Sequence, residues 1–185
     1  MRKVLVVASV LVAAFSLRAS LDGYFMLAGF SRGQLPSPAY SIYGGRLSLI
    51  YGDCHELYGF DTGIAGTTQE NAYGLQVNAV WSGVDADMAG AQIGLFNTVN
   101  GSVAGFQCGA FDWSAELFGC QVGLINLSDD CYGAQLGFWN DAYDVRGCQL
   151  GVVNVAKKLY GCQLGLVNVE TACDMPVWLL LNIGW

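Results

Sequence analysis

The stretches Gly147-Cys-Gln-Leu-Gly-Val-Val-Asn154 and Gly161-Cys-Gln-Leu-Gly-Leu-Val-Asn168 decide the fold of this chain, because both carry one pattern. Two earlier stretches share it, Gly90-Ala-Gln-Ile-Gly-Leu-Phe-Asn97 and Gly119-Cys-Gln-Val-Gly-Leu-Ile-Asn126. The common unit is Gly-x-Gln-x-Gly-apolar-apolar-Asn. Self-similarity at a fixed period is the signature of a repeat architecture.

The unit recurs along most of the chain at steps of 14 to 16 residues. Its first glycine is found at Gly45, Gly59, Gly74, Gly90, Gly105, Gly119, Gly133, Gly147 and Gly161. A further step of 14 reaches Met175, and the segment from Met175 to Asn182 keeps the Asn in phase. We therefore count ten units; the first two and the last are degenerate, with Leu47 and Asp61 at the Gln position of the first two.

The residue types within each unit predict strands. Gly, Val, Leu, Phe and Tyr are frequent, as expected of strands rather than helices. Turn residues separate the units, for example Ser128-Asp129-Asp130 and Asn100-Gly101-Ser102. We expect a strand of about 10 residues and a turn of about 3 to 4 in each unit.

Because side chains alternate along a strand, an even period keeps the two faces of every unit in phase. One face is apolar and carries Cys148, Leu150 and Val152, usually after an aromatic residue. The other face is small and polar, with Gly147, Gln149 and their equivalents. Its Gln column runs through Gln76, Gln92, Gln107, Gln121, Gln135, Gln149 and Gln163.

These faces favour an all-β antiparallel meander that closes into an outer-membrane-type β-barrel of about 10 to 12 strands. Such a barrel alternates an apolar outer face with a polar lumen, and glycines beside the Gln column would suit a narrow lumen. The apolar final segment also ends on an aromatic residue, Trp185, although Trp185 shares the phase of the Gln column. Paired apolar residues such as Phe138 and Trp139 favour the barrel, because a soluble coil would expose one of them.

A β-solenoid with 14-residue coils is the alternative. It explains the exact repetition more simply, and the column of Asn97, Asn126, Asn140, Asn154 and Asn168 would stack as an amide ladder at a bend. In this alternative we expect Leu150 inside the coil and Gly151 outside. The barrel predicts the reverse, with Gly151 facing the lumen.

In these units the chain resembles bacterial surface-repeat proteins made of tandem Gly-x-Gln-x-Gly-apolar-apolar-Asn units. The end, Met175-Pro-Val-Trp-Leu-Leu-Leu-Asn-Ile-Gly-Trp185, is similar to the terminal segment of such proteins. The resemblance covers residues 74–185 and is faint over 20–73. It implies an exported surface or outer-membrane protein and no particular activity.

The N-terminus predicts export. Arg2 and Lys3 precede an apolar run from Val4 to Phe15, as in a secretory signal peptide, and the run is too short to span a bilayer. We expect residues 1–19 to be a signal peptide and 20–185 a single β-repeat domain. The expected location is the outer membrane or cell surface of a Gram-negative bacterium.

Composition points to partners other than nucleic acid. The formal net charge is −7, which repels a phosphate backbone, so nucleic-acid binding is disfavoured. Only 12% of the residues are charged and 54% are hydrophobic. Because this is unusually apolar, membrane lipid is the expected partner.

The cysteines resemble packing residues more than a disulfide framework. Their number, seven, is odd, and Cys120, Cys148 and Cys162 share one repeat column with alanines. We expect most of them to be reduced, with a few disulfides possible among Cys54, Cys131 and Cys173.

No arrangement in the sequence predicts catalysis, a cofactor or a metal. His55 is the only histidine, so a Ser-His-Asp triad would depend on it, and no metal-ligand spacing surrounds it. The pairs Asp85 with Asp87 and Asp129 with Asp130 lie in turns without the further oxygen ligands that Ca²⁺ needs. The predicted function is a non-enzymatic cell-envelope protein, an outer-membrane barrel or narrow channel; the alternative is a surface β-solenoid for adhesion or scaffolding.

Overall fold

The computed structural model describes residues 26–27 and 37–185, and its regular structure there consists of strands. The strands are β1 (Met26–Leu27), β2 (Ile42–Cys54), β3 (Leu57–Thr68), β4 (Ala72–Val84), β5 (Met88–Ile93), β6 (Phe96–Glu170) and β7 (Val177–Gly184). The predicted signal peptide, residues 1–19, lies outside the described residues. Among the described residues, no helix has the length and apolar character needed to span a membrane.

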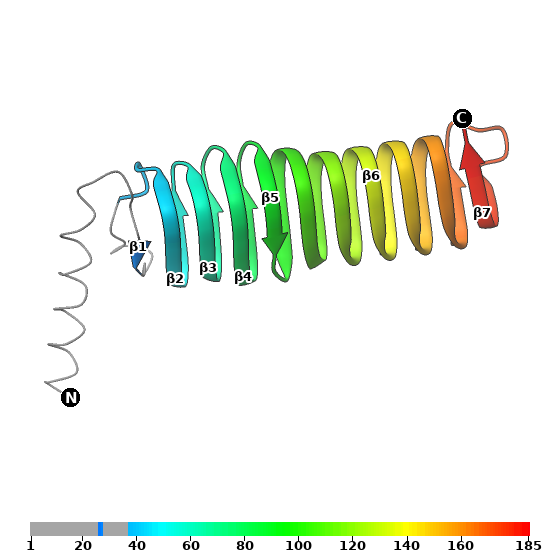
Figure 1. Ribbon diagram of the computed structural model, residues 1–185. Helices are drawn as coiled ribbons and strands as arrows, with labels where there is room; N and C mark the ends of the chain where they lie inside the picture. The colour runs from blue at the N-terminus through cyan, green and yellow to red at the C-terminus, as the bar shows by residue number, and fades with distance from the viewer. Residues whose placement is uncertain (1–25, 28–36) are drawn as a thin grey trace, which may run out of the picture.

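The chain winds into a β-solenoid. Strands β1 to β6 pair with their neighbours in parallel, and β6 continues for 75 residues through coil after coil. Figure 1 shows the coils stacked side by side into a rod, from β2 at one end to β7 at the other. The predicted antiparallel barrel is therefore wrong, and the alternative of a β-solenoid is correct.

The register sets equivalent residues of successive coils side by side. Gly59 pairs with Gly74, Gly74 with Gly90, and Gly90 with Gly105. Each of these glycines has a positive φ, and a Cβ on Gly74 would lie 1.9 Å from the carbonyl oxygen of Gly59. Only glycine fits such a position, so this column fixes the bend of every coil.

The register corrects the start of the repeat. Gly44, rather than Gly45, lies opposite Gly59, and Arg46 consequently lies opposite Asp61. The residue of the first coil in the Gln column is therefore Arg46 instead of Leu47. A polar residue keeps this position from one end of the rod to the other.

Two columns of small and apolar side chains form the apolar part of the core. The first lies two residues before the bend glycine and comprises Ile42, Leu57, Ala72, Met88, Val103, Leu117, Cys131, Val145 and Leu159. The second is narrower and comprises Cys54, Thr68, Val84, Val99, Ser114, Ser128, Ala142 and Ala156. Each coil thus contributes one larger and one smaller side chain, which stack on those of the next coil.

The remaining interior is polar. The Gln and Asn columns are buried, whereas Leu150 is 37% exposed and Leu164 is 51% exposed. The interior face is therefore the small, amide-bearing face, the same face that the predicted barrel would turn toward its lumen. Our expectation for the solenoid, with Leu150 inside and Gly151 outside, is wrong.

The last strand closes the rod. Strand β7 pairs antiparallel with the final coil of β6, with Asn182 opposite Gln163 and Gly184 opposite Gly161. The segment after Met175 is therefore not a tenth coil in phase with the others. It turns back and covers the end of the polar column, as a terminal cap does in repeat proteins.

Candidate functional site

The interior amides form a continuous hydrogen-bonded ladder. Gln107 donates from Nε2 to Oε1 of Gln92 at 2.9 Å, and the same contact recurs between every following pair as far as Gln163, at 2.7–2.9 Å. The second Nε2 proton goes to a main-chain carbonyl, such as that of Val155 for Gln149, or to a serine hydroxyl. A buried amide costs little only when its donors and acceptors are paired, and here an identical neighbour supplies the pairing.

Charged side chains take the place of the amides in the two coils before Gln76, whose own Nε2 donates to Oγ1 of Thr68. Arg46 donates from Nε to Oδ1 and from Nη2 to Oδ2 of Asp61, both at 2.7 Å. Arg46 also donates to the main-chain carbonyl of Thr67, and Asn78 donates to Oδ2 of Asp61. The pair is fully buried, so these additional hydrogen bonds offset its desolvation.

A different set of polar groups ends the ladder at the C-terminal side. Asn182 of β7 donates from Nδ2 to Oε1 of Gln163 at 3.0 Å and to Oε2 of Glu170 at 3.3 Å. Glu170 in turn accepts the main-chain N–H of Leu159. These contacts give the last glutamine a donor that no further coil would supply.

The outer surface carries apolar and aromatic columns. Tyr43, Tyr58 and Tyr73 stack ring on ring, with centroids 4.8 and 4.9 Å apart. Arg146 lies over the rings of Tyr132 and Tyr160. Large apolar side chains on the outside include Leu124, Phe138 and Leu166. Apolar and aromatic side chains thus recur on the outside of many coils, although Ala89, Ala104 and Arg146 replace the aromatic residue in three of them.

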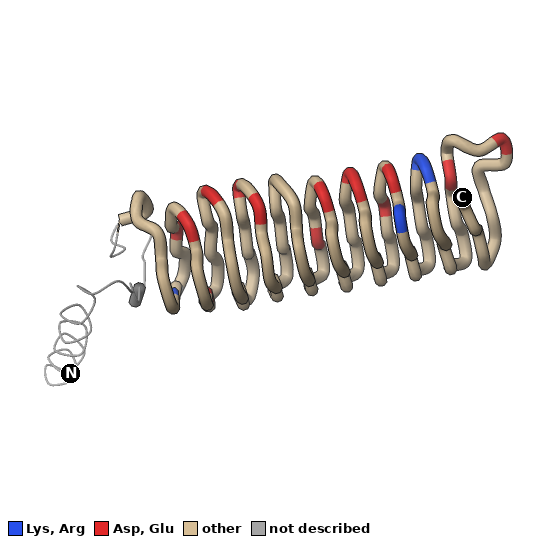
Figure 2. Tube along the Cα trace, turned by 45° about the horizontal axis from the view of Figure 1, so that its top comes forward, with Lys and Arg blue, Asp and Glu red and all other residues tan. Residues whose placement is uncertain are grey.

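Acidic residues gather along one edge of the rod. Figure 2 shows them in successive coils near this edge, with basic residues close to the C-terminal end. Burial raises the pKa of Asp130, and the nearby carboxylates of Asp144 and Glu116 raise it further. The described residues also include Lys157 and Lys158, which precede the acidic residues Glu170 and Asp174; Nζ of Lys158 lies 3.8 Å from Oδ2 of Asp144.

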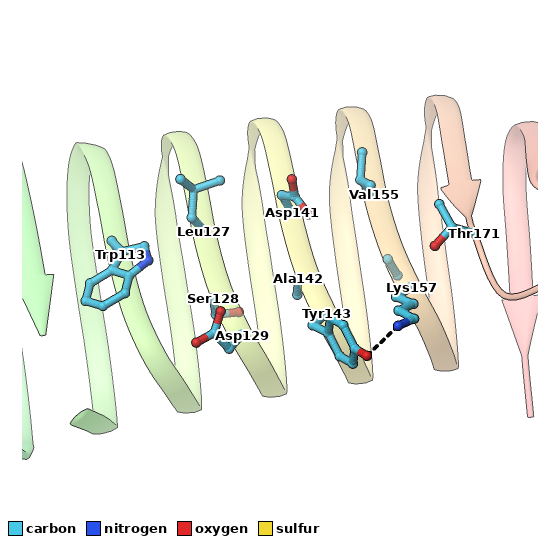
Figure 3. Close-up of a pocket in the computed structure, with 11 residues that line it drawn as sticks. Trp113, Leu127, Ser128, Asp129, Asp141, Ala142, Tyr143, Val155, Lys157 and Thr171 are labelled. Carbon is cyan, nitrogen blue, oxygen red and sulfur yellow. Dashed lines mark hydrogen bonds between the residues drawn. The ribbon is translucent and has the colours of Figure 1, made fainter. Parts of the chain in front are cut away.

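A shallow groove of about 390 Å³ runs beside this edge. Its floor consists of the buried small residues Ser128, Ala142 and Ala156, and its walls include Trp113 and Tyr143 (Figure 3). The groove crosses several coils because an inward column lies between two outward columns.

The residues considered for chemistry serve turns or the surface. The main-chain N–H of His55 donates to the carbonyl of Tyr40 in the turn after β2. Asp85 and Asp87 lie between β4 and β5; Asp85 accepts from Nδ2 of Asn100, and Asp87 accepts the main-chain N–H of Ser102, both in β6 of the next coil. Asp129 lies at the groove. In the described part of the chain, no three His, Cys, Asp or Glu side chains are grouped to hold a metal.

All seven cysteines lie within the described residues, and each is free. Cys54 and Cys131 are buried core residues, and Cys173 is exposed. Cys148 and Cys162 occupy one column on the outside of neighbouring coils, half-buried, with their sulfurs 3.1 Å apart. Burial raises the pKa of Cys131 to about 12, which leaves its thiol protonated and weakly nucleophilic.

Neither a family model, a curated protein nor a solved structure matches this chain. The class of protein therefore follows from the fold alone, which is a β-solenoid with a polar interior ladder and an apolar, aromatic exterior.

Proposed function

We propose that this chain is an exported, non-enzymatic β-solenoid that serves as a rigid scaffold at the bacterial surface. The observation that carries the proposal is the unbroken Gln ladder, which joins every coil from Gln76 to Gln163 through the interior. A ladder of this kind uses its polar side chains to hold coils together. The repeated outer columns are then free to contact other components of the envelope.

Scaffolding is tested by changing the length of the rod. Deletion of residues 133–146 removes one 14-residue repeat, after which Gln121 is in register with Gln149. We expect a folded protein whose rod is shorter by about 4.8 Å, the spacing of neighbouring strands. Deletion of residues 133–139, half a repeat, is the matched control and should abolish folding. It sets the buried Val145 at the exposed position of Phe138, and Asn140 at the position of Gly133, where a Cβ would lie 2.0 Å from a main-chain oxygen.

Small-angle X-ray scattering and thermal unfolding of both deletions give the readout. Failure of the whole-repeat deletion to fold would contradict the equivalence of the coils, and with it the scaffold proposal. Normal folding of the half-repeat deletion would contradict it as well.

Surface location is tested on intact cells. Lys157 and Lys158 are the only lysines after the predicted signal peptide, and Lys158 is 48% exposed. A membrane-impermeant amine reagent should label the peptide that contains them without lysis, and the Lys157→Arg/Lys158→Arg variant should lose this label. Labelling of this peptide only after lysis would contradict a location on the cell surface.

Membrane lipid remains the partner that we propose for the apolar exterior. Leu124 and Leu166 belong to one outer column and are 62% and 61% exposed. We expect the protein to float with vesicles of phosphatidylethanolamine and phosphatidylglycerol, and Leu124→Ser with Leu166→Ser to weaken flotation. Equal flotation of variant and parent would contradict lipid contact through this column.

A further inference from the structure

The Asn column forms a second interior ladder with a fixed direction. Asn126 donates from Nδ2 to Oδ1 of Asn140 at 2.7 Å, Asn140 donates to Asn154 at 2.8 Å, and Asn154 donates to Asn168 at 2.8 Å. The second Nδ2 proton of each donor goes to a main-chain carbonyl, those of Leu136, Leu150 and Leu164. Rotating an amide by half a turn would set its oxygen against these carbonyls, so the direction of the ladder is determined by the main chain.

Asp112 occupies the place of an asparagine in this column. It lies 14 residues before Asn126, and it accepts from Nδ2 of Asn97 through Oδ1 at 2.6 Å. Its side chain is fully buried. The ladder therefore runs from Asn97 to Asp112 and resumes at Asn126, with a carboxyl group where the next link needs a donor.

The link from Asp112 to Asn126 lacks that donor if Asp112 is ionised. Oδ2 of Asp112 and Oδ1 of Asn126 are both buried and without a hydrogen-bond partner. They lie on the same side of Gly123, at 2.8 and 2.9 Å from the position that a Cβ there would take. Two unpaired acceptors of this kind are costly inside a protein, and one proton shared between them would satisfy both.

We propose that the folded solenoid can hold a proton on Asp112, that the protonated carboxyl donates from Oδ2–H to Oδ1 of Asn126 as an asparagine-like link, and that this link opens when the proton is lost. The groups that contact the carboxyl are neutral: the amide of Asn97 and the main-chain N–H of Gly109 donate to it, and Asn126 lies on the other side. No charged side chain of the described residues contributes to its electrostatic environment.

The acidity of the group agrees with this assignment. Burial raises the pKa of Asp112 to about 6, against the lowering effect of the hydrogen bonds from Asn97 and Gly109. The ordinary pKa of the carboxyl is 3.8. At pH values between 3.8 and about 6, the folded protein therefore keeps a proton that the unfolded chain has mostly lost. The contribution of Asp112 to stability is thus greatest at low pH and decreases as the pH rises through about 6.

The Asp112→Asn variant tests the proposal, because an amide supplies the missing donor at every pH. We expect its melting temperature to be close to that of the parent near pH 4. The variant should become increasingly more stable than the parent as the pH rises through 6, and the difference should level off above it. Taking the difference between the two proteins cancels the titration of the other carboxyls.

The Asn140→Asp variant is the matched control. It places a second carboxyl in the same ladder, between Asn126 and Asn154, and should acquire the pH dependence that Asp112→Asn loses. The carboxyl ¹³C shift of Asp112, followed through a pH titration, reports the proton directly.

Two results would overturn the assignment. One is a difference between parent and Asp112→Asn that stays constant with pH, as expected of an ionised Asp112. The other is failure of Asp112→Asn to fold, because asparagine occupies this position in the following coils.

Discussion

Arg46 and Asp61 form a buried ion pair at the two column positions that glutamine holds in the coils from Gln76 onward. Their side chains are fully buried, and Nε of Arg46 lies 2.7 Å from Oδ1 of Asp61. An arginine supplies several donors and a carboxylate only acceptors, so the two side chains satisfy each other, and the first amide of the ladder, Gln76, donates instead to Oγ1 of Thr68 at 3.2 Å.

Loss of one partner of this pair should be costly. Arg46→Ala leaves the buried carboxylate of Asp61 without its counter-charge, and we expect a loss of about 3 to 5 kcal/mol in the free energy of unfolding. The double variant Arg46→Gln/Asp61→Gln, which extends the amide column, should recover most of it. Urea unfolding of the three proteins measures this, and equal stability of Arg46→Ala and the parent would contradict burial of the pair.

The direction of side chains in the coil is tested at neighbouring positions. A Cβ on Gly151 would lie 2.4 Å from the carbonyl oxygen of Gly137 and 2.6 Å from Nδ2 of Asn140. Gly151→Leu should therefore destabilise by about 1 to 3 kcal/mol or more, or prevent folding. The side chain of Leu150 points outward, so Leu150→Phe should leave the melting temperature almost unchanged. Thermal unfolding that showed the opposite order of sensitivity would place Leu150 inside the coil.

The Gln ladder should tolerate no single apolar replacement. Gln135→Leu removes the donor to Oε1 of Gln121 and the acceptor for Nε2 of Gln149. Because each group left unpaired costs about 1 to 3 kcal/mol, we expect a clear drop in the midpoint of chemical unfolding. Leu136→Gln, on the outer face of the same strand, is the control and should have little effect. An unchanged unfolding midpoint in Gln135→Leu would mean that the ladder does not hold the coils together.

The cap should protect the end of the rod. Removal of residues 175–185 takes away β7, which exposes the edge of the last coil and leaves Oε1 of Gln163 without the donor Asn182. Exposed edges pair with other strands, so we expect the shortened protein to associate into larger species. Sedimentation velocity at several concentrations measures this, and a monodisperse shortened protein would contradict the capping role.

The sequence predicts the period, the β structure and the two faces, since all three follow from the repeat. The turns expected at Asn100-Gly101-Ser102 and Ser128-Asp129-Asp130 are wrong, because both stretches lie within the continuous strand β6. The apolar face was assigned to a membrane or to a core, because apolar side chains are usually buried. The coil instead buries Gln149 and Asn154, whose amides pair with identical residues one coil away. The repeated identity of the Gln and Asn columns is the signal that indicates this.

Two features of the interior cannot be predicted from the repeat alone, for physical reasons. For the ion pair, the doublet Gly44-Gly45 leaves the start of the first coil ambiguous by one residue, and a start at Gly45 sets Leu47 rather than Arg46 in the Gln column. Opposite charges at equivalent column positions are the signal that could have revealed it. A single aspartate between Asn97 and Asn126, Asp112, becomes significant only when the side chains are known to be stacked and buried.

The central claim, a rod of parallel coils, is tested most directly by distances between spin labels on one outer column. Leu124 and Leu166 lie three coils apart, in the coils of Gly119, Gly133, Gly147 and Gly161. Ile64 and Leu166 lie seven coils apart, from the coil of Gly59 through those of Gly74, Gly90 and Gly105 to that of Gly161. With labels introduced as unnatural amino acids, pulsed electron paramagnetic resonance measures both pairs without disturbing the cysteines.

At a strand spacing of about 4.8 Å, the solenoid predicts about 14 Å for the first pair and about 34 Å for the second. The distance should thus grow in proportion to the number of coils. In a closed barrel of 10 to 12 strands, distances rise and then fall around the ring, so the second pair would be little farther apart than the first. That result would contradict the solenoid.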